Sequence, residues 1–383
     1  MIYLDHSATT PLHPEVLAAM MPYLTTQYGN PSSLYRLGQQ ARQAVENSRR
    51  RVAARLNAAA PREIVFTGGG TESDNLALRG IALARQAEGR QLITSAIEHE
   101  AVLATMEALA TDIGFDLTVL PVDAQGRLRV ADLAAALRPE TTLVSVMAAN
   151  NEVGTVQPIA EIGALLRRHT AFFHVDAVQA GGYLPIDVQA WGVDALSLSA
   201  HKFHGPKGVG LLYLRRGTPL HSPVTGGGQE AALRSGTHNV AAIVGFAEAF
   251  ELAQRERAAK NQRLSALRDR LVAGLLAALP EARLSGHPTE RLPGHVSLLL
   301  GAGIAADMMI AALDMAGIAA SSGSACASGR NEASHVLRAM GVPEDEALSA
   351  LRLTLGDGTT DVEIDQVIAQ LPPLVARLRE VAL

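Results

Sequence analysis

The chain has 383 residues, of which 48% are hydrophobic and 19% charged, a composition that excludes a disordered protein and is typical of a globular one. Its length suggests two or three domains. Lysine and arginine number 33 against 38 acidic residues, for a net charge of −5, which argues against broad binding to nucleic acid or to an anionic membrane.

From about residue 63, short β-branched runs alternate with stretches that carry apolar residues at helical spacing. This alternation predicts a mostly parallel α/β sheet, and runs that are apolar on both faces fit a sheet covered on both sides. The expected strands are 63–67, 91–95, 117–120, 143–147, 171–175, 195–199 and 209–214, and the expected helices include 72–86, 101–111 and 159–168.

The pattern changes near residue 238 and predicts a smaller α+β domain. One or two long helices are expected over 238–279, and a helix over 305–315. Strands are expected near 282–284, 295–300 and 350–355, and the last stretch has one apolar face at helical spacing.

A glycine-rich turn, Gly68-Gly69-Gly70-Thr71, follows a predicted strand and opens a predicted helix. Glycine lets the backbone approach an anion, and a helix N-terminus presents free N–H groups, so a phosphate fits there. The alternative is a plain strand-to-helix turn. The spacing matches neither the dinucleotide-binding nor the P-loop pattern.

Asp176 and Lys202 each follow an apolar run, at the edge where parallel sheets bind ligands. A carboxylate there needs a partner, such as a protonated ring nitrogen, and a lysine there can form a Schiff base. Taken singly, Asp176 is better explained as a strand-end cap or a salt-bridge partner, and Lys202 as a solvated loop residue. His201 and His204 lack further nearby ligands, so no metal site is expected.

Together, the glycine turn, Asp176 and Lys202 resemble a pyridoxal 5'-phosphate enzyme of the aspartate-aminotransferase fold type. The resemblance implies an α/β fold, with a large domain built on a mainly parallel seven-stranded sheet and a smaller α+β domain. The expected boundaries are 12–255 for the large, cofactor-binding domain, and 1–11 with 256–383 for the small one.

The single cysteine, Cys326, lies in the Gly/Ser/Ala-rich stretch 321–329. It allows no intramolecular disulfide and no multi-cysteine zinc site, and it favours the reducing cytoplasm. No signal peptide or transmembrane span is expected. A lone cysteine is commonly a small buried hydrophobe. These neighbours instead predict an accessible loop, as a working thiolate requires.

The segment SSGSAC, followed by Ser334-His335, resembles the catalytic loop of cysteine desulfurases of the NifS/IscS type. Further blocks resemble that family in order along nearly the whole chain: LDHSATTP (4–11), GNPSS (29–33), EIVFTGGGTESDNLA (63–77), EHEAV (98–102), NNEVGTVQPI (150–159), HVDAVQ (174–179), SAHKFHGPKGVG (199–210) and RSGTHN (234–239).

The resemblance implies conversion of L-cysteine to L-alanine, with the sulfur left as a persulfide on Cys326. Lys202 resembles the Schiff-base lysine and proton carrier, and His99 the acid/base histidine stacked over the cofactor ring. The implied cofactor-binding residues are Gly70, Thr71, His99, Asn151, Asp176, Gln179, Ser199, His201, Lys202 and Thr237. The implied substrate-binding residues are Arg352, Asn30 and Asn151.

The same resemblance implies partners. Thr237 resembles a phosphate ligand donated by the other subunit, so a homodimer with shared sites is expected, together with a sulfur acceptor for iron-sulfur assembly or thiolation. Two departures bear on the acceptor: Asp357 stands where relatives commonly carry arginine, and the chain stops at Leu383, where scaffold-feeding relatives carry a further tail.

Other functions remain open on the residues alone. A selenocysteine lyase, or another lyase or aminotransferase of the same fold, shares most of these residues, although a transaminase needs no cysteine nucleophile. A non-catalytic assembly partner is a third possibility, against which the set of Lys202, Asp176, His99 and Cys326 weighs.

Overall fold

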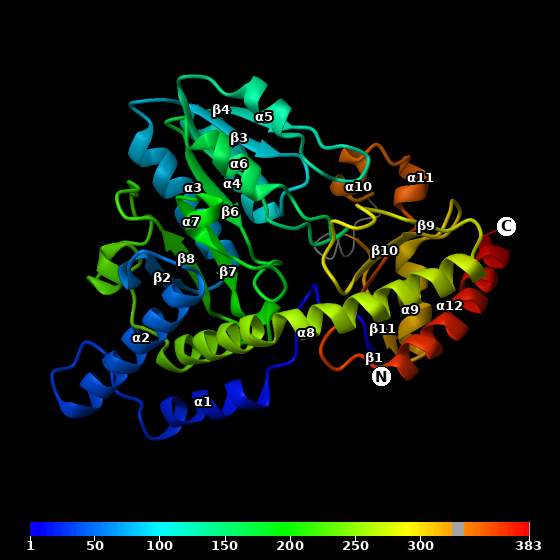
Figure 1. The fold of residues 1–383 in the computed structure, drawn as a ribbon, viewed down its shortest axis with the longest axis horizontal. Coiled ribbons are helices and arrows are strands. Elements are labelled where there is room, and N and C mark those ends of the chain that lie inside the picture. Colours follow the sequence, from blue (N-terminus) through cyan, green and yellow to red (C-terminus); the bar gives the residue numbers. More distant parts are fainter. Residues whose placement is uncertain (324–332, 383) are drawn as a thin grey trace.

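The computed structural model describes residues 1–323 and 333–382. Within them the chain forms a larger part built on a seven-stranded sheet and a smaller part built on short sheets (Figure 1). The α/β fold expected from the sequence is confirmed.

The large sheet has the strand order β2-β8-β7-β6-β5-β3-β4. All its strands are parallel except β8, which runs antiparallel to both of its neighbours. Their bounds are β2 Ile64–Thr67, β3 Gln91–Ser95, β4 Asp116–Leu120, β5 Thr141–Ser145, β6 Phe172–Asp176, β7 Ala195–Ser199 and β8 Gly210–Leu214.

Both faces of this sheet are covered, which explains why its strands, apart from the edge strand β4, are buried almost throughout. In β8, Leu212 packs under α3 and α4, whereas Leu211 and Tyr213 face the opposite core. The helices and turns of this part are α1 Pro14–Thr25, α2 Arg36–Arg55, η1 Pro61–Glu63, α3 Gly70–Arg85, α4 Glu100–Ile113, α5 Val130–Ala136, α6 Ile159–Leu166, α7 Val188–Trp191, η2 Ala200–Lys202 and η3 Gln229–Ala232.

One long helix, α8 (Val240–Ala278), joins the two parts (Figure 1). Its residues up to Ala253 pack into the core of the large part, and those from Leu264 onward pack into the core of the small part. The expected boundary at residue 255 therefore falls inside a continuous helix.

The small part contains the antiparallel sheet β12-β10-β9 and the parallel pair β1-β11. Because β1 pairs with β11, the N-terminus of the chain belongs to this part and lies beside residues 318–319 (Figure 1). The bounds are β1 Ile2–Tyr3, β9 Arg283–Leu284, β10 His295–Leu299, α9 Ala306–Met315, β11 Ile318–Ala319, α10 His335–Ala339, α11 Glu344–Ala347, β12 Ala350–Thr354 and α12 Asp361–Ala382.

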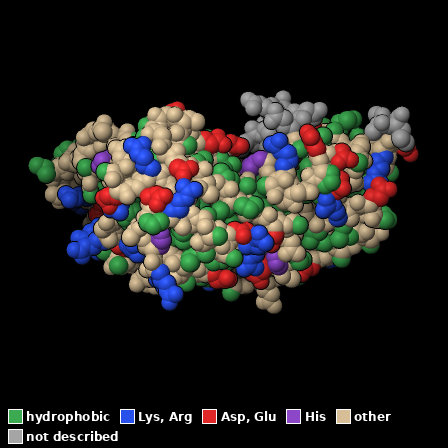
Figure 2. All heavy atoms as spheres, turned by 90° about the horizontal axis from the view of Figure 1, so that it is seen from above, with side chains coloured by type: hydrophobic (Ala, Val, Ile, Leu, Met, Phe, Trp, Pro, Cys, Tyr) green, Lys and Arg blue, Asp and Glu red, His purple; other side chains and the backbone are tan. Residues whose placement is uncertain are grey.

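The surface carries charges of both signs. On the face in Figure 2, acidic and basic side chains are interspersed with apolar ones, in keeping with the near-balanced composition. None of the helices in the described ranges is long and apolar enough to cross a bilayer.

Candidate active site

A cavity of about 290 Å³ lies at the carboxyl ends of the large sheet's strands, where open parallel sheets bind ligands. It gathers residues from both parts of the molecule. Most of the predicted site residues line it: Gly70, Thr71, His99, Asn151, Asp176, Gln179, Ser199, His201, Lys202 and Arg352.

Lys202 ends the 3₁₀ turn η2, directly after β7. Its Nζ donates to the carbonyls of Ser7 at 2.5 Å and Ala8 at 3.0 Å. The Gln179 amide also donates to the Ser7 carbonyl, at 3.0 Å. The N-terminal segment therefore forms one wall of the cavity and orients the lysine.

Asp176 is the last residue of β6 and is 6% exposed. Its Oδ1 accepts a hydrogen bond from the backbone N–H of Val178 at 2.9 Å. Burial raises the pKa of Asp176, while His99 and Lys202 act in the opposite direction. A cationic ring nitrogen in the cavity would favour the carboxylate form further.

His99 is the N-cap of α4, where its Nδ1 accepts from the backbone N–H of Ala101 at 3.0 Å. In the neutral ring the proton must therefore reside on Nε2. His99 can therefore cap α4 and line the cavity at the same time, because the cap hydrogen bond fixes the orientation of the ring.

The glycine turn borders a second cavity of about 580 Å³, which shares Gly70, Thr71, Ser199 and His201 with the first. Lys207 adds a positive charge. Burial, together with the charges of Lys202 and Lys207, lowers the pKa of His201 to about 4, so that this imidazole is neutral near pH 7. The N-terminus of α3 and these side chains suit a phosphate.

Arg352 reaches the cavity from β12 in the small part and is 1% exposed. Its Nη2 pairs with Asp5 at 3.0 Å, and its Nη1 donates to the carbonyls of Asn151 at 3.0 Å and Gly323 at 3.4 Å. Its Nε has no partner among the described residues. A bound carboxylate would satisfy this donor.

Two of the predicted residues that the structure describes are not brought to the cavity. Asn30 and Thr237 are exposed and do not line it. The Asn30 Oδ1 instead accepts from the backbone N–H of Ser32 at 2.9 Å. Cys326 lies outside the described residues.

Sequence reasoning did not identify two buried acids that lie at or beside the cavity. Asp74, on the first turns of α3, lines the cavity and is 1% exposed. Burial and the nearby Asp176 raise its pKa well above the usual value. Glu98 is fully buried beside His99, and burial raises its pKa to about 8. A motif position alone does not reveal that an acid is buried.

Asp357, the departure from the resembled family, joins the two parts of the molecule. Its carboxylate lies 3.2 Å from the Nε2 of His204, which follows the Lys202 turn. Its backbone carbonyl accepts from Arg263 of α8 at 2.8 Å. The carboxylate therefore forms an ion pair when His204 is protonated.

The residues present fit pyridoxal 5'-phosphate. The phosphate end has helix N–H groups and a Gly70 position at which a Cβ would lie 2.8 Å from Val178 Cγ2, so that a side chain has no room. At the other end the buried Asp176 can hold a protonated ring nitrogen, and Lys202 faces the same space. The fold and this site together define a pyridoxal-phosphate-dependent enzyme of the aspartate-aminotransferase fold type.

Comparisons with known proteins narrow the class. The aminotransferase class-V family model matches residues 2–367. Cysteine desulfurase IscS of Clostridium botulinum (strain Hall) is 46% identical over 382 residues, covering 100% of this chain and 96% of the relative. Among solved structures, a NifS-like protein has a TM-score of 0.92 at 37% identity, covering 98% of this chain and 99% of that one.

A structure described as SspA in complex with cysteine has a TM-score of 0.81 at 36% identity, covering 93% of this chain and 99% of that one. The chain belongs to the class-V aminotransferase family and, within it, to the cysteine desulfurases. Its activity is that of a pyridoxal-phosphate-dependent cysteine desulfurase.

Proposed function

We propose that the 290 Å³ cavity is where this chain removes sulfur from L-cysteine, and that Cys326 receives it. The observation that carries the proposal is the convergence of Lys202, Asp176, His99 and Arg352 on one space. When bound, pyridoxal 5'-phosphate supplies an electron sink for the substrate's α-carbon. The remaining roles belong to side chains of this chain.

Arg352 would bind the substrate carboxylate, because its buried guanidinium has an unsatisfied Nε. Asp5 and the Asn151 carbonyl hold its other nitrogens, so its plane is fixed before substrate arrives. Lys202 would move the α-proton, and His99 would exchange a proton through Nε2, since its Nδ1 is engaged by the α4 cap.

The sulfur transfer balances without an added oxidant. The thiolate of Cys326 forms an S–S bond with the substrate sulfur while the substrate's Cβ–S bond breaks. The electron pair of the broken bond stays with carbon and takes up a proton. The products are L-alanine and a persulfide on Cys326.

The test replaces Cys326 with alanine and with serine. Both variants should retain the cofactor's visible absorption and bind cysteine, but release almost no alanine and carry no persulfide by mass spectrometry. Serine should not substitute, because an alcohol is a much weaker nucleophile than a thiolate at neutral pH. Near wild-type turnover in Cys326→Ala would contradict the proposal and indicate an ordinary lyase.

We further propose a homodimer with shared sites. Exposed apolar side chains gather on α1 and the following segment: Leu17, Met21, Leu24, Tyr28, Leu34 and Tyr35. Leu34 is 88% and Tyr28 is 72% exposed, and such a patch on a globular chain favours a protein partner. Asn30 belongs to the same segment. A second copy that packs against this surface would therefore place its own cofactor cavity near Asn30 of the first copy.

The sulfur acceptor is proposed to be a protein serving iron-sulfur assembly or thiolation, in the cytoplasm. The single cysteine supports a reducing compartment. An assay of alanine release with and without candidate acceptors distinguishes them, since a true acceptor accelerates turnover by discharging Cys326.

A further inference from the structure

A run of three non-glycine residues adopts the left-handed backbone conformation in η3. The φ angles are 48° at Glu230, 55° at Ala231 and 64° at Ala232. Each costs free energy relative to the right-handed region for an L-residue with a Cβ. Such conformations persist where the surrounding structure holds them, and they cluster at functional sites.

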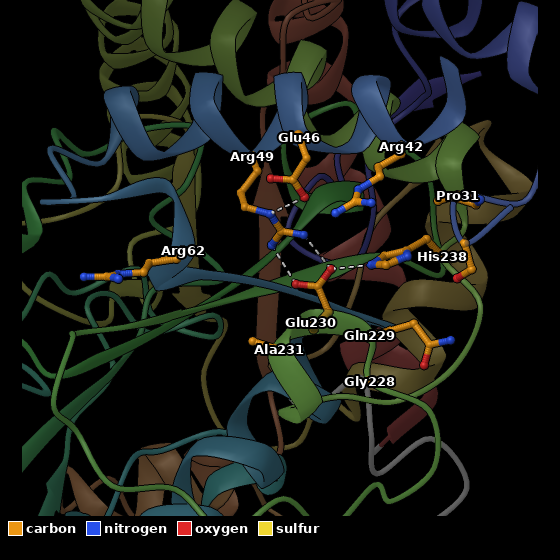
Figure 3. A pocket seen from close by; sticks show the side chains of 11 residues that line it. Pro31, Arg42, Glu46, Arg49, Arg62, Gly228, Gln229, Glu230, Ala231 and His238 are labelled. Carbon is orange, nitrogen blue, oxygen red and sulfur yellow. Dashed lines mark hydrogen bonds and ion pairs between the residues drawn. The ribbon is translucent and has the colours of Figure 1, made fainter. Parts of the chain in front are cut away.

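Glu230 provides that hold. It is 7% exposed, and its carboxylate accepts from Arg49 Nη1 at 2.6 Å and Nη2 at 2.7 Å. It also accepts from the backbone N–H of Phe66 at 3.0 Å, and its Oε1 lies 2.7 Å from the Nε2 of His238 (Figure 3). Arg49 in turn donates to the Ile64 carbonyl at 2.5 Å. The cluster thus links the turn to α2 and to β2.

Despite burial, which acts in the opposite direction, the bonds from Arg49 and His238 lower the pKa of Glu230 to about 2. The carboxylate is therefore charged throughout the neutral range. A bidentate, charge-assisted pair of this kind fixes orientation as well as distance.

A second ion pair holds the same segment further along. Arg234 Nε lies 2.6 Å from Glu72 on α3, and its Nη2 donates to the other carboxylate oxygen at 3.2 Å. Thr237 lies between Arg234 and His238, both of which are held, yet Thr237 itself is exposed. The segment is thus tied down on either side of a residue that faces outward.

The cavity beside this cluster has a volume of about 520 Å³, and its lining includes Pro31, Ser32, Gln229 and His238. Figure 3 shows Pro31 and His238 close to each other. Asn30 and Thr237, the two predicted site residues that the 290 Å³ cavity lacks, directly adjoin these lining residues in sequence. Both therefore belong to surfaces that converge here, away from the chain's own cofactor cavity.

We propose that Glu230 is a positioning residue: through Arg49 and His238 it presets the segment 229–239 so that Thr237 is presented to the cofactor site of a second copy. The inference rests on the shared-site dimer of the proposed function and goes beyond it. It assigns to Glu230 an effect on cofactor binding in the partner, although Glu230 lies outside its own chain's cofactor cavity.

The chain offers a matched control. Glu46 lines the same 520 Å³ cavity and pairs with the same arginine, its Oε1 lying 3.2 Å from Arg49 Nε. Glu46 lies on α2, however, and its side chain is 51% exposed. Glu46→Gln therefore makes the same charge change beside the same partner without touching the left-handed turn.

The first measurement is the dissociation constant of pyridoxal 5'-phosphate in each homodimer, followed by the cofactor's visible absorption during dialysis. Glu230→Gln should weaken cofactor binding by about tenfold or more, as expected from losing charge-assisted hydrogen bonds that hold a ligand-bearing loop. Glu46→Gln should remain close to wild type. Equal binding by Glu230→Gln and wild type would overturn the inference.

The second measurement locates the effect, using mixed dimers purified through different tags. Paired with Lys202→Ala, the Glu230→Gln chain should regain one tight, active site, which combines its Lys202 with the intact segment of the other chain. Paired with Thr237→Ala, it should regain none, because each site then receives a defective segment. The reverse pattern would assign Glu230 to its own chain's site and overturn the inference.

The mixed-dimer experiments also distinguish the proposed role of Glu230 from the shared-site dimer on which it rests. Recovery when Lys202→Ala is paired with Thr237→Ala supports the shared site itself, and its absence removes both ideas. If that recovery occurs while Glu230→Gln binds cofactor like Glu46→Gln, the dimer stands and only the role of Glu230 is wrong.

Discussion

Two carboxyl groups share the floor of the cofactor cavity, and their environments assign them different charges. Asp176 has His99, Lys202 and a backbone N–H to favour its charged form. Asp74 is buried with its Oδ1 unpartnered among the described residues, 3.5 Å from the Nε2 of His174. Burial lowers the pKa of His174 to about 3, so this imidazole is neutral near pH 7 and brings no compensating charge.

We therefore expect Asp74 to be the member that keeps its proton, and we expect asparagine to replace it nearly without effect. Asp74→Asn should keep wild-type cofactor affinity, whereas Asp176→Asn should lose about tenfold or more, because it removes the charge opposite the ring nitrogen. Both dissociation constants are measured by absorbance titration. Equal losses in the two variants would show that Asp74 is ionised.

Burial of Glu98 makes the stability of the folded chain fall as pH rises through the weakly acidic and neutral range. The pKa of Glu98 rises from 4.5 to about 8 on folding because burial disfavours the charge. The folded state therefore holds a proton that the unfolded state releases, and stability falls as pH rises from about 4.5 through about 8. The Glu98→Gln variant should lack this fall, which amounts to roughly 1.4 kcal/mol per pH unit at most.

Urea denaturation of Glu98→Gln and wild type across pH 5 to 9, a range chosen to span roughly the titration of Glu98, measures the difference. Glu107→Gln, an exposed change on α4, the helix that follows Glu98, serves as the control. Parallel stability curves for Glu98→Gln and wild type would contradict the raised pKa.

At the residue scale, the sequence predicts which side chains line the cavity, but it does not predict which acidic side chains are buried. Lys202, Asp176 and Arg352 line the expected cavity because motif position and strand ends determine their placement. Asp74 and Glu98 escaped prediction because an acid in a helical or turn motif looks solvated until both faces of the sheet are covered. Their burial results from tertiary packing, which the periodicity of the sequence does not reveal.

At the scale of the elements, close packing of α6 against α7 explains the presence of a glycine inside α6, which helix periodicity does not explain. Gly163 lies in α6, and a Cβ there would fall on the Trp191 carbonyl at the end of α7. Alanine usually favours a helix over glycine by about 1 kcal/mol. At this position overlap with rigid backbone should dominate instead.

Gly163→Ala should therefore destabilise the chain by roughly 1–3 kcal/mol, in the range of overpacked cores. Chemical denaturation measures the change, and Ala164→Gly at the neighbouring exposed position gives the propensity effect alone. A stabilised Gly163→Ala protein would show that α7 yields to the added methyl group.

Element prediction succeeded where burial is continuous and failed where it is sparse. The predicted strands 91–95 and 195–199 match the structure. All five residues of each strand are buried, so each strand stands out in the sequence as one continuous run. Helix α2 gave no signal, since its buried face consists largely of Ala41, Ala44 and other small residues between arginines. The two-residue strands β1 and β11 are too short for any period to appear.

For the whole molecule, the exposed apolar surface on α1 and its following segment predicts the assembly state. Leu24→Glu combined with Leu34→Glu places charges in that surface and should yield a monomer in sedimentation velocity. The monomer should bind pyridoxal 5'-phosphate more weakly, because Thr237 of the second copy is then missing. Met315→Glu is the control, since Met315 is 90% exposed at the end of α9. Dimers in the double variant would show that another surface joins the copies.

The pairing of β1 with β11 has a consequence for synthesis of the chain. The carbonyls of Ser7 and Ala8, which accept from Lys202, follow β1. Within the described residues β1 pairs with 318–319, and the Leu4 carbonyl accepts from the backbone N–H of Thr354. A ribosome must therefore deliver more than nine-tenths of the polypeptide, about 354 of 383 residues, before the contacts between this segment and the small part can all form. A nascent chain with its large sheet already formed would still lack the Arg352 guanidinium and the strand β11 that holds β1 in the small part. Reactive chemistry is thereby withheld until translation is nearly finished.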